Sequence, residues 1–237
     1  MASGSENPGL ERVRHELRAT GIKDASANPL RSGIHSRGYL PHAKREGAEY
    51  FVTFRLADSL PKEVLLRYEG ERAERLRALL AAKRTGRQTA DREENINRDF
   101  RRQVERYLDQ CAGACHLRRP EIACLVEGAL KFFHEQRYAL REWVIMPNHV
   151  HVLFWPMPNY LVSDIVKSWK QFASLRAKPL LGLPSGRFWQ PEPFDHWVRN
   201  DDERARIARY IRNNPVTARL CARPEDWRWS SAWRKAS

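Results

Sequence analysis

Two segments joined by a short turn constrain the fold more than any other part of the 237-residue chain. The apolar segments Arg137–Met146 and His149–Trp155 are each long enough for a strand, and only two residues separate them. Pro147 and Asn148 are typical of tight turns. The sequence therefore predicts an antiparallel hairpin, which needs further strands and helices to cover it.

The rest of the pattern predicts an α+β, ferredoxin-like fold. Along the strand Tyr50–Leu56 every second side chain is apolar and shares one face. Besides this strand and the hairpin, the expected core elements are helices at about Ile122–Gln136 and Leu161–Leu180, a strand at Phe194–Arg199, and a helix from Asn200 to about Asn213. This order is the split βαβ arrangement, an RRM-like antiparallel palm that many nucleic-acid proteins share. Fold alone assigns no function.

The last of these helices has a start signal and a stop signal. Asn200, with Glu203 three residues later, is a plausible N-cap pair. Pro215 is expected to end the helix, because the residue before a proline is disfavoured in helical conformation.

An arginine-rich pair of helices is expected between the first strand and the next core helix. Lys62–Lys83 and Arg92–Leu108 are rich in helix formers and flank the breaker run Thr85–Thr89. All eight tryptophans lie from Trp143 onward. The helical pair therefore reads as an insertion, at about 61–110, within a main domain spanning 37–220. A polar extension at 1–36 and a tail at 221–237 complete the expected organisation.

The charge of the chain indicates a polyanionic partner. Lys and Arg number 42 against 29 acidic residues, a net charge of +13. Such a surface binds phosphates without reading sequence. The alternative is a basic protein whose charge is merely solvated. No apolar stretch is long enough for a membrane helix or resembles a signal peptide, so a cytoplasmic location without membrane contact is expected.

A histidine pair begins the second strand of the hairpin. His149 and His151 are two residues apart, so both imidazoles point to one face of the sheet and can reach one ion. Ordinary packing or surface histidines are the alternative reading.

A tyrosine shares a helical face with a possible metal ligand. Ile207, Tyr210, Ile211 and Asn214 follow at i, i+3, i+4 and i+7. A core tyrosine is the simpler reading. However, Asn214 is a poor interior helix residue, and its carbonyl oxygen suits Mg²⁺ or Mn²⁺.

Several other side chains are candidates for contacting nucleic acid, each with a plain structural alternative. The cations compete with ordinary surface charge, and the indole competes with core packing. They are Lys167, Lys170, Arg187, Trp189 and Arg199.

Taken in order, the motifs resemble those of a known family. They are YFVTFRLADSLP, WVIMPNHVHVLFWP, SWKQF, FWQPEPFDHWVRNDDE, RYIRNNPVTARL and PEDWRWSSA, within Arg37–Ser231. This set resembles the REP-associated tyrosine transposases, a branch of the single-tyrosine transposases in the HUH endonuclease superfamily. The resemblance implies that His149 and His151 bind a metal and that Tyr210 is the nucleophile. It implies Asn214 as third ligand, with Gln190 and Asp195 as local rivals.

The resemblance also implies a reaction and a substrate. A divalent ion, Mg²⁺ or Mn²⁺, would assist attack on single-stranded DNA through a 5′-phosphotyrosine intermediate. The expected partner is single-stranded DNA beside REP-like palindromic hairpins, bound by a monomer. Two alternatives remain: a non-catalytic RRM-like module that binds hairpin DNA or RNA, and a zinc hydrolase or two-histidine phosphoesterase. A zinc hydrolase would need further Asp and His ligands, and a two-histidine phosphoesterase would need two separate His-x-Thr/Ser motifs; the sequence around His149 and His151 supplies neither.

Overall fold

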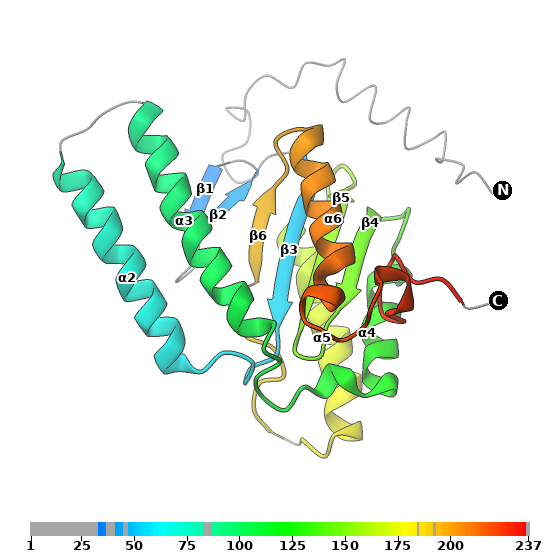
Figure 1. The fold of residues 1–237 in the computed structure, drawn as a ribbon. Helices are drawn as coiled ribbons and strands as arrows, with labels where there is room; N and C mark the ends of the chain where they lie inside the picture. Colours follow the sequence, from blue (N-terminus) through cyan, green and yellow to red (C-terminus); the bar gives the residue numbers. More distant parts are fainter. Residues whose placement is uncertain are drawn as a thin grey trace.

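A four-stranded antiparallel sheet forms the centre of the molecule (Figure 1). The computed structural model describes residues 33–36, 41–44, 47–82, 87–183, 185–191 and 193–235. The strands lie in the order β4-β5-β3-β6. Their bounds are β3 Tyr50–Arg55, β4 Tyr138–Ile145, β5 His149–Pro156 and β6 Phe194–Trp197.

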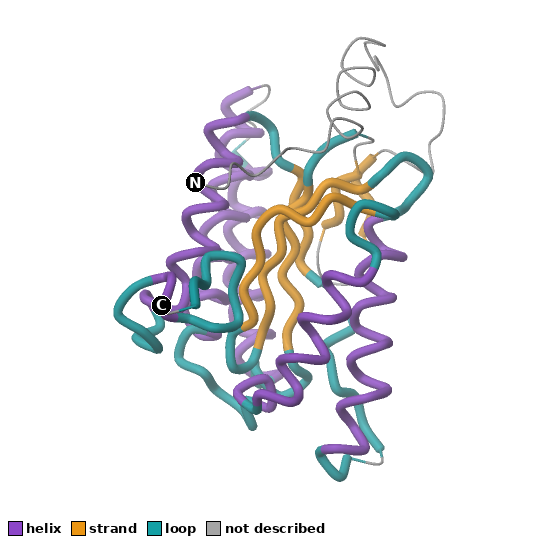
Figure 2. The backbone as a smooth tube through the Cα atoms, turned by 90° about the vertical axis from the view of Figure 1, so that its right-hand side faces the viewer, coloured by secondary structure: helices purple, strands orange, loops and turns teal. Residues whose placement is uncertain are grey.

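The connectivity confirms the predicted ferredoxin-like arrangement. In chain order the core runs β3, α4 (Pro120–Phe132), β4, β5, α5 (Val162–Leu180), β6. The first strand of this series lies between the third and the fourth, as the split βαβ arrangement requires. Figure 2 shows the sheet between two helical layers: α4 and α5 cover one face, and α6 (Asp201–Thr217) covers the other.

The alternation along the strands gives the sheet two buried faces. The face toward α4 and α5 carries the larger apolar cluster, in which the Trp169 indole donates to the Tyr138 hydroxyl at 2.8 Å. Each large side chain buried there contributes about 1.5–3 kcal/mol. The opposite face buries Phe51, Leu153 and Ile211 beneath α6. His149 and His151 are four and two residues before Leu153 on β5, so their side chains lie on the same face as Leu153 and face α6.

The predicted inserted helices are present as an antiparallel pair, α2 (Lys62–Ala81) and α3 (Arg87–Leu108), between β3 and α4 (Figure 1). Helix α3 begins inside the predicted breaker run, at Arg87 rather than Arg92. The run contains no proline, and Gln88 in its second half and Ala90 directly after it favour a helix.

Helix α6 does not end where the sequence predicts. The N-cap is confirmed: Asn200 Oδ1 accepts a hydrogen bond from the Glu203 amide at 2.8 Å. The helix continues through Pro215 to Thr217, so the prediction that Pro215 ends it was wrong. A proline close to a helix end costs little, because only one intrahelical hydrogen bond is lost there. The chain turns only at Arg219, whose φ is 58°.

The two ends of the described chain border the sheet. A short hairpin of β1 (Gly33–Ser36) and β2 (Pro41–Lys44) lies where the sequence predicted the end of the polar extension and a turn-rich approach. Most of that extension falls outside the described residues. Near the other end, the Ile145 amide donates to the Trp229 carbonyl at 2.8 Å, so this segment protects the β4 edge. None of the helices in the described ranges is both long and apolar enough to cross a membrane.

Candidate active site

The two histidines of β5 converge on one point. Both side chains are fully buried, and their Nε2 atoms are 3.0 Å apart. Two ligand atoms at about 2.1 Å from one ion, at right angles, are separated by about 3.0 Å. The spacing of the pair therefore fits two neighbouring positions around an octahedral ion.

Hydrogen bonds behind the rings fix their orientation. Asn148 Nδ2 donates to the carbonyls of Leu108 and Ala112, which leaves Asn148 Oδ1 to accept from His149 Nδ1 at 2.7 Å. His151 Nδ1 lies 2.7 Å from Thr53 Oγ1 on the neighbouring strand. With both Nδ1 atoms engaged, the Nε2 lone pairs are presented toward each other, the arrangement in which imidazoles ligate metals.

Helix α6 brings a tyrosine and an asparagine to the same point. The Tyr210 hydroxyl lies 3.2 Å from His151 Nε2, and its ring packs edge-on against Phe51. Asn214, one turn later, is buried, and neither atom of its amide has a hydrogen-bond partner of good geometry among the described residues. The amide lies close enough to His149 and Tyr210 to affect their pKa values. An orphaned buried amide is costly unless a ligand satisfies it.

Burial keeps both imidazoles neutral. It lowers the pKa of His149 to about 3, assisted by the positive charge of Arg55, and holds the pKa of His151 well below its usual value. Neutral imidazole is the form that binds a metal. Arg55 lies opposite His149 on β3, is itself buried, and its Nε has no hydrogen-bond partner in the part of the chain that the structure describes. Burial lowers its pKa to about 10.

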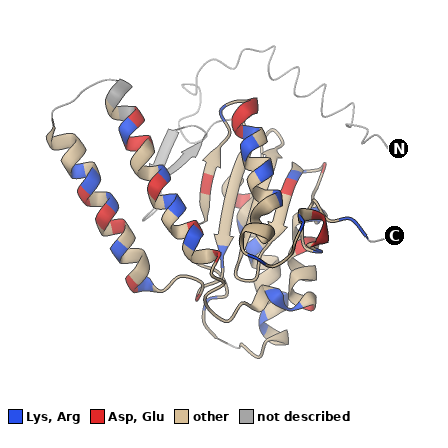
Figure 3. Ribbon diagram, in the orientation of Figure 1, with Lys and Arg blue, Asp and Glu red and all other residues tan. Residues whose placement is uncertain are grey.

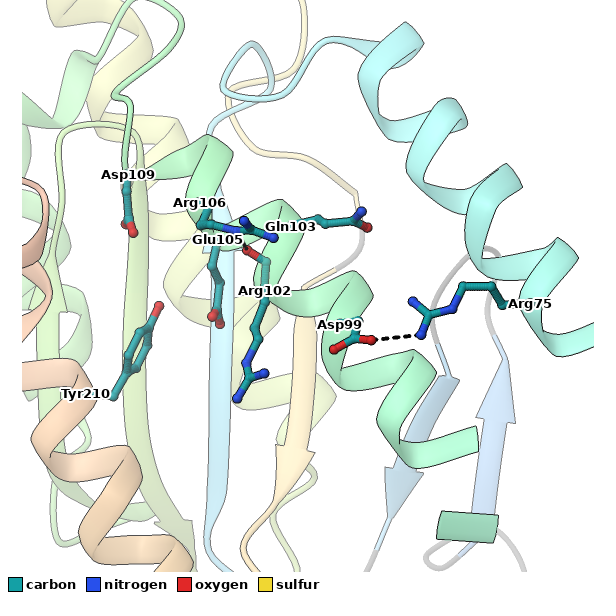
Figure 4. Close-up of a pocket in the computed structure, with 8 residues that line it drawn as sticks. All are labelled: Arg75, Asp99, Arg102, Gln103, Glu105, Arg106, Asp109 and Tyr210. Atoms are coloured by element: carbon teal, nitrogen blue, oxygen red, sulfur yellow. Dashed lines mark hydrogen bonds and ion pairs between the residues drawn. The ribbon is translucent and has the colours of Figure 1, made fainter. Parts of the chain in front are cut away.

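The inserted helix contributes two carboxyl groups that sequence reasoning missed. Glu105 near the end of α3 and Asp109 just after it face Tyr210 (Figure 4). Burial raises the pKa of Glu105 to about 7 and that of Asp109 to about 6. Burial and these two carboxylates hold the pKa of the Tyr210 phenol well above its usual value. The four-residue spacing puts both acids on one side of α3, but nothing local indicates that this side faces Tyr210.

A pH-dependent stability follows from Glu105. Its carboxyl holds a proton more tightly in the folded protein, so the stability that this proton contributes is present below about pH 4.5 and is lost as the pH rises to about 7. At about pH 8, Glu105→Gln should raise the free energy of unfolding of the metal-free protein by on the order of 1–3 kcal/mol, which a higher melting temperature would report. Near pH 4 the substitution should change neither quantity. The exposed Glu93→Gln on the same helix is the control, and an equal gain at both pH values would contradict the prediction.

The two rival ligands lie elsewhere. Gln190 Nε2 donates to the Ala57 carbonyl at 2.6 Å, so its amide is engaged. Asp195 pairs with Val52 in the register of β3 and β6. Paired residues share a face, so Asp195 lies on the sheet face away from the histidines. Of the three candidates for third ligand, only Asn214 lies beside the histidine pair.

The structure does not gather the predicted nucleic-acid contacts into one site. Lys167 and Lys170 lie on α5, behind the sheet, and Lys170 Nζ donates to the Gln190 carbonyl at 2.6 Å. Trp189 is 6% exposed and its indole donates to the Lys170 carbonyl, so it presents no face to a base; packing explains this residue better than stacking. Arg187 is exposed on the loop before it. Arg199 lies on the α3 side, paired with Glu94 at 3.0 Å.

The ferredoxin-like sheet thus carries a histidine pair that faces a tyrosine on α6. The family described as "Transposase IS200 like" matches residues 125–214, which include both histidines, Tyr210 and Asn214. Residues 125–214 of the chain are thus similar to the IS200-like transposases.

The chain is also similar to a REP-associated tyrosine transposase of Escherichia coli (strain K12). The two are 26% identical over 110 residues, which cover 46% of this chain and 64% of that protein. A solved structure titled as the REP-associated tyrosine transposase bound to a REP hairpin matches with a TM-score of 0.45 and 16% identity, over 84% of this chain and 82% of the other. A solved structure titled as a putative transposase from Deinococcus radiodurans R1 matches with a TM-score of 0.29 and 19% identity. The match covers 77% of this chain and 98% of the other.

Proposed function

We propose that the protein is a metal-dependent, single-stranded DNA endonuclease and transposase that uses Tyr210 as its nucleophile. The observation that carries the proposal is the convergence at one buried point. Two Nε2 atoms oriented by Asn148 and Thr53 meet the Tyr210 hydroxyl there. The unsatisfied Asn214 amide lies beside them. A packed core rarely leaves both polar atoms of a buried amide unsatisfied, as they are in Asn214.

His149, His151 and Asn214 would hold the ion, Mg²⁺ or Mn²⁺. When bound, it supplies charge that polarises the scissile phosphate and stabilises the departing 3′ oxygen. All three side chains are neutral, so they leave the positive charge of the ion available to the phosphate. The described residues contain no cluster of three His, Cys, Asp or Glu side chains that could hold a metal. This argues against the zinc hydrolase reading and is compatible with an amide as third ligand.

The protein side chains position and deprotonate the nucleophile. Tyr210 Oη would form a bond to phosphorus while the bond to the 3′ oxygen breaks and its electron pair stays on that oxygen. The phenolic proton must leave, and the Glu105 carboxylate faces the hydroxyl that releases it. The product is a 5′-phosphotyrosine and a free 3′ end. Because the link conserves the phosphodiester bond, a 3′-hydroxyl of another strand can reverse the step and join DNA.

The substrate we propose is a hairpin with an adjacent single strand, as in REP-like palindromes, bound by a monomeric cytoplasmic protein. The name of the Escherichia coli relative supports the REP element. The net charge of +13 supports phosphate binding along a stem. No feature of the described residues favours the alternative of a non-catalytic hairpin-binding module.

Incubation of end-labelled hairpin oligonucleotides with protein and Mg²⁺ or Mn²⁺ tests the proposal. A covalent protein–DNA adduct on a denaturing gel is the expected result. Absence of any adduct or cleavage, with hairpin binding intact, would overturn the proposed activity and favour the binding module.

The form of the substrate gives a second prediction. A flexible single strand can bend toward a buried tyrosine, whereas a stiff duplex cannot. Annealing a complementary strand across the cut region should therefore suppress cleavage by at least about tenfold while binding persists, and binding should weaken steeply with salt. The measurement compares both forms at matched occupancy. Equal cleavage of the duplex would instead indicate a conventional double-strand nuclease.

A further inference from the structure

Two hollows reach Tyr210, and the α3 side chains Arg102 and Glu105 line both of them. The larger, of about 640 Å³, lies between α2, α3 and Tyr210 (Figure 4). The smaller, of about 210 Å³, lies between α3 and α6 over β3 and the edge strand β6. Since His149 and His151 are fully buried, a substrate has to approach Tyr210 through such a hollow.

The smaller hollow, which we call the α3–α6 groove, has an excess of positive charge. Four arginines line it: Arg98, Arg101, Arg102 and Arg206. Arg101 is paired with Glu94 at 3.0 Å, whereas the other three side chains are exposed and form no ion pair within the described ranges. Figure 3 shows the basic residues along both helices. In the larger hollow, by contrast, Arg75 is paired with Asp99, and Asp109 adds a second carboxyl group that the groove lacks.

The acids of the α3–α6 groove are already engaged. Glu203 accepts the Arg199 amide at 2.8 Å and lies 3.0 Å from His196 Nε2, because it closes the first turn of α6. Glu105 faces the Tyr210 hydroxyl. Arg98, which also donates a hydrogen bond to Asn95, forms no ion pair among the described residues, and neither do Arg102 and Arg206. These three are thus the groups left to bind an anion in this groove.

Aromatic rings line the groove beside the arginines. Phe194 is half-buried on β6, stands edge-on to Phe51 at 6.4 Å, and lies under the Arg101 guanidinium at 5.4 Å. Arginines around an aromatic surface are the combination that binds single-stranded nucleic acid, in which phosphates meet cations and bases stack on rings. A merely solvated helical face would not bring cations from two different helices together over a phenylalanine.

We propose that the α3–α6 groove binds the single-stranded DNA next to the phosphate that Tyr210 attacks. Arg98, Arg102 and Arg206 contact its phosphates, and Phe194 contacts a base. The inserted helix α3 is then one wall of the active site rather than a solvated appendage. This inference rests on the proposed function, because it takes single-stranded DNA as the substrate.

Binding measurements in a Tyr210→Phe background test the groove separately from the chemistry. The probe is a DNA hairpin with or without a single-stranded flank, titrated at several salt concentrations. Combined Arg98→Ala, Arg102→Ala and Arg206→Ala substitutions should remove the affinity gained from the flank, about 10- to 100-fold, and lower the salt slope by about 2. Affinity for the hairpin alone should change much less. Phe194→Leu should cost a few-fold, because it keeps bulk but removes the ring.

The control removes three arginines of the inserted helices α2 and α3 that line neither hollow, by Arg67→Ala, Arg77→Ala and Arg92→Ala. Flank affinity should survive in this control, and circular dichroism should show both triple variants folded. A groove variant that retains flank affinity, or loses no more than the control, overturns the inference. If the protein with Tyr210 intact forms no adduct although the flank binds normally, the role of Tyr210 is contradicted and the inference about the groove still stands.

Discussion

Tyr210→Phe is expected to abolish the covalent protein–DNA adduct while preserving the fold and hairpin binding. The substitution removes one hydroxyl and keeps the ring that packs against Phe51 and His151. The substitution loses the hydrogen bond to His151 at 3.2 Å and the contacts of the hydroxyl with Glu105 and Asn214, so stability should change by about 1–2 kcal/mol. Phenylalanine cannot attack phosphorus, and adduct formation should therefore fall below detection on a denaturing gel.

A second tyrosine on a nearby element provides the control. Tyr107→Phe, on α3 two residues beyond Glu105, makes the same chemical change without touching the histidine pair and should keep the adduct. If the adduct persists in Tyr210→Phe and disappears in Tyr107→Phe, the nucleophile has been assigned to the wrong residue.

Local patterns predicted the elements of the fold because each has a local cause. Alternation and the Pro147-Asn148 turn defined the hairpin, and Asn200 with Glu203 defined the start of α6. The order of strands and helices was enough for the ferredoxin-like topology, since few connections of that series are possible. Pro215 misled the prediction, because sequence alone does not show whether a proline stands in the middle of a helix or in its last turn.

The site was predictable only where its residues share one element. His149 and His151 follow from strand parity, and Tyr210 with Asn214 from helical spacing. Thr53 and Glu105 reach the same point from β3 and α3, and nothing in their local sequence indicates it. For Trp189 the residue type was misleading instead: an indole can stack on a base, but this one is buried in the core.

The inserted helices illustrate the limit of composition as a guide. A high density of arginine and glutamate along α2 and α3 is typical of a solvated helical face, and much of α2 is exposed. The structure nevertheless places Glu105 of α3 against Tyr210, and Arg102 lines both hollows that reach this tyrosine. The face of a charged helix that contacts a site depends on how the helix packs against the rest of the protein, and local sequence does not show this.

Substitution of either histidine should reduce DNA cleavage more than any other change except substitution of Tyr210. His149→Ala and His151→Ala are each expected to reduce cleavage by at least about 100-fold, because the two remaining ligands hold a labile ion poorly. Each change also leaves a buried partner, Asn148 or Thr53, without its hydrogen bond, at about 1–3 kcal/mol of stability. Calorimetric titration with Mn²⁺ separates lost metal binding from lost folding, which the melting temperature reports.

Graded variants distinguish a metal centre from a merely structural histidine pair. Asn214→Ala should cause a smaller loss of cleavage, partly recovered at high Mn²⁺, because two imidazoles remain. Thr53→Val removes only the group that orients His151, so it should weaken Mn²⁺ binding by about 10- to 100-fold without removing a ligand. His116→Ala, which lies against Phe188 outside the site, is the control and should leave Mn²⁺ binding unchanged. Undiminished Mn²⁺ binding in a folded His149→Ala or His151→Ala protein would remove that histidine from the proposed ligands, and the 3.0 Å approach of the two rings would then be a packing contact.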